Sequence, residues 1–184
     1  KQGKALSAPI LRGEMKRYEY ESGLLVIPEA EGSGLKDLFG RIKIKPNKKL
    51  TMYNSMRFGR ILVRDTKSNL YGFMDENGKL IIKCEYLTAT DFMRDRPSNT
   101  IYSIVQNKKG HVGVIDPKGA FIIKMTEWID GKRVSEIGAF NEGLAPFAVN
   151  NKDSKFPWMQ DWGYLDLTGK VVIPAQFAWT DRFE

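Results

Sequence analysis

A frame of twelve residues occurs three times in this chain and constrains its fold more than any other feature. Each copy reads apolar, Gly, apolar, apolar, Asp, two variable residues, Gly, one variable residue and three apolar residues. The copies occupy residues 71–82, 112–123 and 162–173. Because repetition of one pattern is typical of folds built from similar small units, we expect a repeat protein.

The frame has the pattern of a β-hairpin. Its Asp can accept hydrogen bonds from backbone amides across a turn, and its second Gly tolerates a positive φ. Asn77-Gly78 is a strong turn signal, and the apolar run that follows it predicts a returning strand. The first Gly of each frame lies inside a strand, which predicts a β-bulge or a neighbouring backbone or ring packed close to it.

One more apolar strand precedes each hairpin, so the repeat is a three-stranded meander. These leading strands are predicted at residues 61–63, 102–105 and 144–149. The predicted fold class is therefore all-β, with tandem three-stranded meander or hairpin repeats. The units are bounded by aromatic residues and cover 58–92, 92–140 and 140–184.

Residues 1–57 match the frame poorly and are expected to form either a degenerate first repeat or an N-terminal cap. In the repeat interpretation, Phe39-Gly40 takes the position of Tyr71-Gly72, and Pro46-Asn47 lies near the turn. Aligned in this way, the segment lacks both the Asp and the second Gly of the frame.

The third copy, beginning Trp162-Gly163-Tyr164-Leu165-Asp166, closely resembles the WG (KWG) repeat of bacterial proteins. The tract 140–145 just before it looks like the lead-in of that family. The resemblance implies a β-rich array, propeller-like or an open stack. It also implies a frequent location in surface, secreted or envelope proteins, no demonstrated catalysis and no cofactor.

The chain shows no pattern typical of an active site or a metal site. Its one histidine, His111, and its one cysteine, Cys84, form no ligand cluster. The three frame aspartates, Asp75, Asp116 and Asp166, are already explained by the turns. We therefore predict no enzyme, no catalytic residue, no metal and no cofactor, while a hydrolase that uses these aspartates remains a minor alternative.

The formal net charge of +7 is unevenly distributed. Residues 1–64 hold 14 Lys and Arg against 6 Asp and Glu, and the remaining residues hold 15 against 16. An alternative function is therefore the binding of an anionic surface or a nucleic acid by the basic first third, close to Phe39, Tyr53 and Arg57. No apolar stretch is long enough for a transmembrane helix.

The leading prediction is a non-catalytic scaffold that binds a protein, peptide or glycan partner. Variable loops at 93–100, 131–138 and 150–160 are expected to make the contact, because loops on a rigid scaffold often carry binding residues. The compartment expected from the resemblance is extracytoplasmic. The candidate binding residues are Arg94, Arg96, Arg133, Lys155, Phe156, Trp158 and Met159.

Overall fold

The computed structural model describes residues 23–29, 32–53, 56–151 and 159–178. Within these ranges every regular element is a β-strand, and there are seventeen of them, paired in antiparallel sheets. The chain divides into two compact units, residues 1–85 and 86–184, which we describe separately. None of the described residues forms a helix that could cross a membrane.

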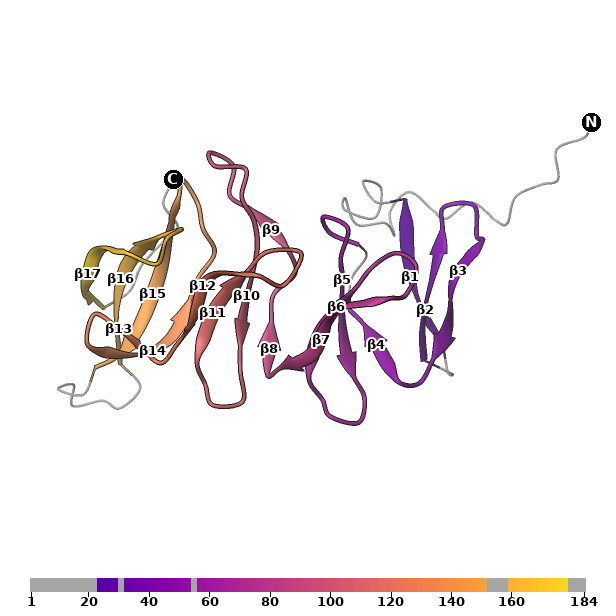
Figure 1. Ribbon diagram of the computed structural model, residues 1–184, viewed down its shortest axis with the longest axis horizontal. Coiled ribbons are helices and arrows are strands. Elements are labelled where there is room, and N and C mark those ends of the chain that lie inside the picture. Colours follow the sequence, from indigo (N-terminus) through magenta and orange to yellow (C-terminus); the bar gives the residue numbers. More distant parts are fainter. Residues whose placement is uncertain (1–22, 30–31, 54–55, 152–158, 179–184) are drawn as a thin grey trace, which may run out of the picture. The chain divides into compact units, whose positions relative to one another are not determined.

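A three-stranded antiparallel meander is the repeated element (Figure 1). The first unit contains two and the second unit two more, so the predicted all-β repeat fold is confirmed. In chain order the meanders are β1 (Leu24–Glu29), β2 (Gly32–Asp37) and β3 (Ile42–Asn47); β5 (Ile61–Asp65), β6 (Tyr71–Met74) and β7 (Leu80–Tyr86); β10 (Ile101–Gln106), β11 (Val112–Ile115) and β12 (Phe121–Thr126); and β15 (Leu144–Asn150), β16 (Gln160–Asp166) and β17 (Val171–Phe177).

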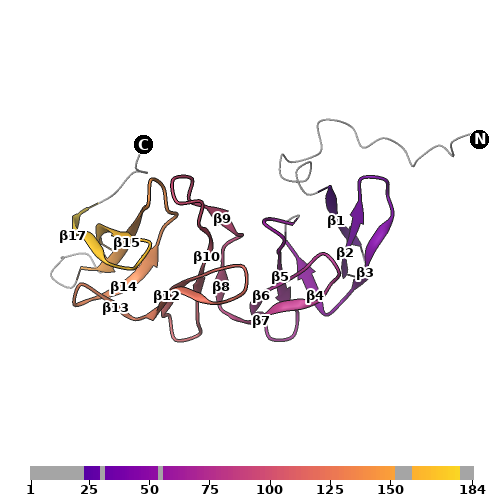
Figure 2. The same ribbon diagram turned by 45° about the horizontal axis from the view of Figure 1, so that its top comes forward.

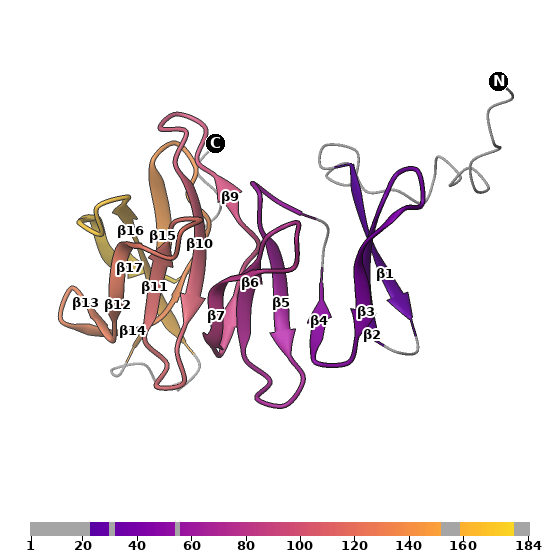
Figure 3. The same cartoon turned by 45° about the vertical axis from the view of Figure 1, so that its right-hand side comes forward.

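The segment that leaves one meander becomes an outer strand of the next sheet. In the first unit, β4 (Leu50–Met52) follows β3 and pairs with β5 (Figure 3). In the second unit, β8 (Thr88–Ala89) and β9 (Met93–Arg94) pair with β10, while β13 (Trp128–Ile129) and β14 (Lys132–Ile137) extend the sheet of β15 (Figure 2). Residues 132–137 are therefore strand, and the loop expected over 131–138 is wrong.

The frame aspartate closes each hairpin turn in the predicted way. Asp75 accepts hydrogen bonds through Oδ1 from the amides of Asn77 and Lys79, both at 2.9 Å. Asp116 and Asp166 make the corresponding bonds in their own turns. The second Gly of each frame has a positive φ, as predicted, because the turn needs the left-handed conformation there.

The first Gly of each frame lets the returning strand bulge against it. A Cβ atom at Gly163 would lie 2.5 Å from the carbonyl oxygen of Ile173 and 2.8 Å from the amide nitrogen of Ala175. The β16–β17 register shifts at this point, between Trp162 and Tyr164. Gly72 has equally close backbone neighbours. The predicted bulge and close backbone approach are therefore confirmed.

The first meander contains the same frame, in a different place from the one expected. Gly34 occupies the first Gly position, Asp37 the Asp position and Gly40 the second Gly position. The Oδ1 atom of Asp37 accepts from the amides of Phe39 and Arg41, both at 2.9 Å. The alignment of Phe39-Gly40 with Tyr71-Gly72 was wrong, and the segment lacks neither the Asp nor the second Gly.

Each unit has a core between its two neighbouring sheets. In the first unit, Leu35, Ile61 and Val63 are fully buried together. In the second unit, Phe147 and Leu165 are fully buried in a larger cluster drawn from β10–β17. Two sheets packed face to face bury the inward residues of both, which positions the variable segments around rigid strands.

Candidate functional site: the Trp128 cleft

The β13–β14 strand pair places an aromatic ring on the outer face of its sheet. Trp128 is 50% exposed, whereas Ile129, the next residue, is buried in the core. Because successive residues of a strand face opposite sides, the inward position of Ile129 sends Trp128 outward.

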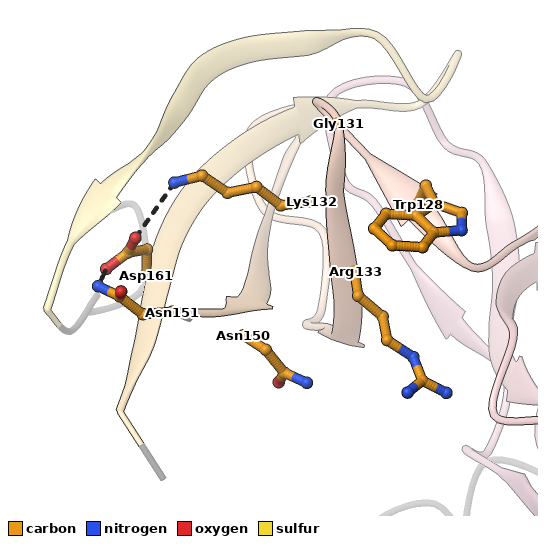
Figure 4. A pocket seen from close by; sticks show the side chains of 7 residues that line it. All are labelled: Trp128, Gly131, Lys132, Arg133, Asn150, Asn151 and Asp161. Atoms are coloured by element: carbon orange, nitrogen blue, oxygen red, sulfur yellow. Dashed lines mark hydrogen bonds and ion pairs between the residues drawn. The ribbon is translucent and has the colours of Figure 1, made fainter. Parts of the chain in front are cut away.

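The neighbours of Trp128 across the sheet are polar. Trp128 pairs with Arg133 on β14, so the two side chains lie on the same face. Val134 pairs with Val149, and the adjacent Asn150 therefore lies next to Arg133 on that face. Figure 4 shows the Arg133 and Asn150 side chains extending in the same direction from their strands.

These residues line a cleft of about 330 Å³, which we call the Trp128 cleft. One aromatic ring, two cations, one carboxylate and two amides meet there, so the cleft combines an apolar surface with donors and acceptors of hydrogen bonds. Its lining residues are Trp128, Gly131, Lys132, Arg133, Asn150, Asn151 and Asp161 (Figure 4).

Ion pairs and hydrogen bonds fix the charged side chains of the cleft. Lys132 Nζ lies 3.2 Å from Asp161 Oδ2, and Asn151 Nδ2 donates to Asp161 Oδ1 at 2.8 Å. Arg133 Nε lies 3.4 Å from a carboxylate oxygen of Glu127. The Lys132–Asp161 pair holds one wall, while the Arg133 guanidinium retains further N–H groups that could bind a ligand oxygen.

Of the predicted binding residues, only Arg133 lines this cleft among those that the structure describes. Arg94 and Arg96 are exposed near β9, and Met159 is 44% exposed just before β16. Lys155, Phe156 and Trp158 lie outside the described residues. Trp128 was not among the predicted binding residues, and the adjacent apolar Ile129 is the one sequence signal that its ring faces outward.

Asp166, Cys84 and His111 each have contacts that belong to the fold. Across the described ranges, no three His, Cys, Asp or Glu side chains converge as metal ligands would. The hydroxyl of Thr168 and the turn amides lower the pKa of Asp166, since they stabilise its charged form. Burial raises the pKa of the Cys84 thiol. His111 lies 3.6 Å from Glu127, at the surface.

Comparison with known families identifies the repeats. The WG containing repeat family matches the chain at three places, residues 71–95, 132–152 and 162–184. This chain is a WG-repeat protein. The matches cover β6 to β9, all of β14 and β15, and β17 with all but the first two residues of β16. No curated protein matches its sequence.

Two hairpins that the family does not match have the same geometry as the matched repeats. The hairpins of β2–β3 and β11–β12 have the same Asp turn and the same Gly in the strand. In these two copies Ser33 and Val112 stand where Trp162 stands in the fourth meander. The shared geometry therefore depends on Gly and Asp, and does not require the Trp for which the family is named.

Proposed function

We propose that this WG-repeat protein is a non-catalytic scaffold that binds a protein, peptide or glycan partner through the segments between its repeated frames. The observation that carries the proposal is the Trp128 cleft. The frame keeps its geometry in all the described meanders. The β13–β14 pair lies between two frames, and it brings the half-exposed ring of Trp128 beside Arg133. Rigid strands below it would present these side chains without a large ordering cost.

The composition of the cleft supports binding. Trp and Arg are enriched among residues that dominate the energy of interfaces, because a broad aromatic ring buries much area with few rotamers and a planar guanidinium offers several N–H donors at once. Asn150 and the Lys132–Asp161 pair add the fixed polar groups that orient a ligand. From the family resemblance we also propose that the protein is bacterial and acts outside the cytoplasm.

Replacing Trp128 by Ala is expected to weaken partner binding about thirtyfold, because the loss of a central aromatic contact typically costs about 2 kcal/mol. Glycan and peptide libraries would be screened with the full chain, and Kd values of the ligands recovered would be compared by calorimetry. Phe121→Ala is the matched control, since Phe121 is an equally exposed aromatic of the same unit outside the cleft.

A Trp158→Ala variant in the same assay tests the separate prediction that the 150–160 segment makes contact. If Trp128→Ala binds as tightly as Phe121→Ala, the cleft is not the site, although the scaffold proposal survives wherever another variant weakens binding. If neither library yields a ligand that the folded chain binds, the scaffold proposal itself fails.

A second candidate is the binding of an anionic partner by the basic first third. Within residues 32–50 there are six Lys and Arg residues and a single acidic one. Five of the six cations are exposed: Arg41, Lys43, Lys45, Lys48 and Lys49. Such a distribution favours an anionic partner, whose binding would weaken steeply as salt is added.

A further inference from the structure

The turn of the β2–β3 hairpin, which we call the first hairpin because it contains the first frame, presents large apolar side chains to solvent. Leu38 is 42% exposed and Phe39 is 55% exposed, and both lie in the two variable positions of the frame, between β2 and β3. Ile42, at the start of β3, is 58% exposed. We call Leu38, Phe39 and Ile42 the apolar tip.

The other three frame turns that the structure describes lack such a tip. Their variable pairs are Glu76-Asn77, Pro117-Lys118 and Leu167-Thr168. Leu167 is partly buried and packs against the core of its own unit. Two adjacent exposed apolar residues at a turn are therefore a property of the first hairpin, which the repeat geometry does not require.

Hydrogen bonds to Asp37 hold the backbone of the turn that carries Leu38 and Phe39. Asp37 is 6% exposed, and it accepts hydrogen bonds from the amides of Phe39 and Arg41 and from Arg41 Nε, the last at 2.6 Å. The Gly40 amide also donates to the Asp37 carbonyl at 2.9 Å. A turn fixed in this way can present Leu38 and Phe39 with little further loss of entropy.

Cations surround the apolar tip. The Arg41 guanidinium carbon lies 5.2 Å from the centre of the Phe39 ring. Lys36 precedes the turn on β2, and Lys43 follows it on β3, where it is exposed. Asp37, the one acidic residue nearby in the sequence, is already paired with Arg41. The end of the hairpin therefore combines apolar side chains with a positive potential.

This combination separates two kinds of anionic partner. A bilayer that contains anionic lipids offers phosphates for cations and, a few ångströms deeper, an acyl region for apolar side chains. A nucleic acid duplex offers the phosphates, but it gives the exposed side chains of the apolar tip no comparable apolar environment. The apolar tip thus favours the bilayer.

We propose that the first hairpin docks on an anionic lipid bilayer, with Leu38 and Phe39 inserted at the interface and with Lys36, Arg41 and Lys43 at the headgroups. The proposal rests on the second candidate function, binding of an anionic partner, and names that partner. It is independent of the Trp128 cleft.

The test uses the full chain and co-sedimentation with vesicles of phosphatidylcholine alone or mixed with phosphatidylserine. We expect binding to the mixed vesicles only, and a reduction of about tenfold or more in the Leu38→Ser, Phe39→Ser double variant, because two inserted apolar side chains are lost. A Leu87→Ser, Phe121→Ser double variant is the matched control, since these residues are 45% and 47% exposed elsewhere. It should bind as the parent chain does.

Insertion is measured directly with Phe39→Trp. Brominated phosphatidylcholine in the mixed vesicles should quench the fluorescence of this variant more than that of the parent chain or of Phe121→Trp. Circular dichroism and thermal unfolding show whether each variant keeps its fold, and Phe39→Trp serves as the conservative change if the serine variant unfolds.

Two outcomes would overturn the proposal. Absence of binding to the mixed vesicles is one, and binding that the serine variant does not weaken is another, since the contact would then be electrostatic alone. If the chain binds a DNA duplex but not the vesicles, the bilayer is wrong while the anionic-partner candidate survives. If it binds neither probe, both fail.

Discussion

Replacing Gly163 by Ala is expected to destabilise the second unit by about 3 kcal/mol, the upper part of the range for overpacked sites. The added Cβ would lie 2.5 Å from the Ile173 carbonyl oxygen and 2.8 Å from the Pro174 carbonyl carbon. Both are backbone atoms of β17, so neither can move aside without breaking the hairpin. Urea unfolding followed by tryptophan fluorescence would measure the change in midpoint.

Gly113→Ala is the matched control for this prediction. Gly113 has the same place in the frame of β11, but its Cβ would meet the Ile123 carbonyl oxygen at 3.1 Å and Met125 at 3.2 Å. A shift of a few tenths of an ångström would relieve these contacts, so the loss of stability should be clearly smaller. Equal losses in the two variants would show that the bulge geometry does not set the requirement for Gly.

Replacing Asp95 by Asn is expected to lower the stability of the second unit by about 2 kcal/mol at neutral pH, a typical value for hydrogen bonds to a charged group. Asp95 is fully buried. Its Oδ1 accepts from the Gly143 amide at 3.0 Å, and its Oδ2 accepts from the Ser98 hydroxyl at 2.6 Å. Asp95 thus connects the β9–β10 turn to the segment before β15.

The same carboxylate predicts a dependence of stability on pH. Burial raises the pKa of Asp95, but the hydrogen bonds from Ser98 and Gly143 outweigh it and leave the pKa below its ordinary value of 3.8. A depressed folded pKa contributes stability above the unfolded pKa, and this contribution is lost as the pH falls through the folded value. The difference between the parent chain and Asp95→Asn should therefore shrink in acid.

Urea midpoints measured at neutral pH and in steps below pH about 4 would follow this convergence. Asp130→Asn, a change of the same kind at an exposed residue of the same unit, should leave the midpoint nearly unaltered at each pH. A constant difference between the parent chain and Asp95→Asn down to the lowest pH would show that the charge of Asp95 does not stabilise the fold.

Interactions within the frame could be predicted from sequence because they are local. The Asp of each frame bonds to amides two and four residues later, and such turns depend on a few neighbouring residues. Gly113 and Gly163 likewise predicted the bulges, and Gly72 the close approach of the neighbouring backbone. The first frame was misplaced because Ser33 and Lys36 stand where the other copies have apolar residues, although Gly34, Asp37 and Gly40 keep the spacing.

The candidate site was less accessible to sequence reasoning, because it depends on which strands pair over long distances. Arg133 was predicted to contact a partner, but its segment was expected to be a loop and proved to be β14. Pairing of β14 with β15 brings Asn150 next to Arg133, and the inward position of Ile129 exposes Trp128. Neither the pairing of β14 with β15 nor the outward direction of Trp128 follows from the amino-acid composition of this segment.

The sequence by itself therefore determined the repeating hairpin, its Asp turn and its Gly bulge, since each depends on contacts within about a dozen residues. Only the tertiary structure decided that the segment leaving one meander becomes an outer strand of the next sheet. It also decided that Trp128 and Phe39 face outward. Register and burial fix such side-chain directions, and a change of one residue in register moves a side chain from the core face to the solvent face.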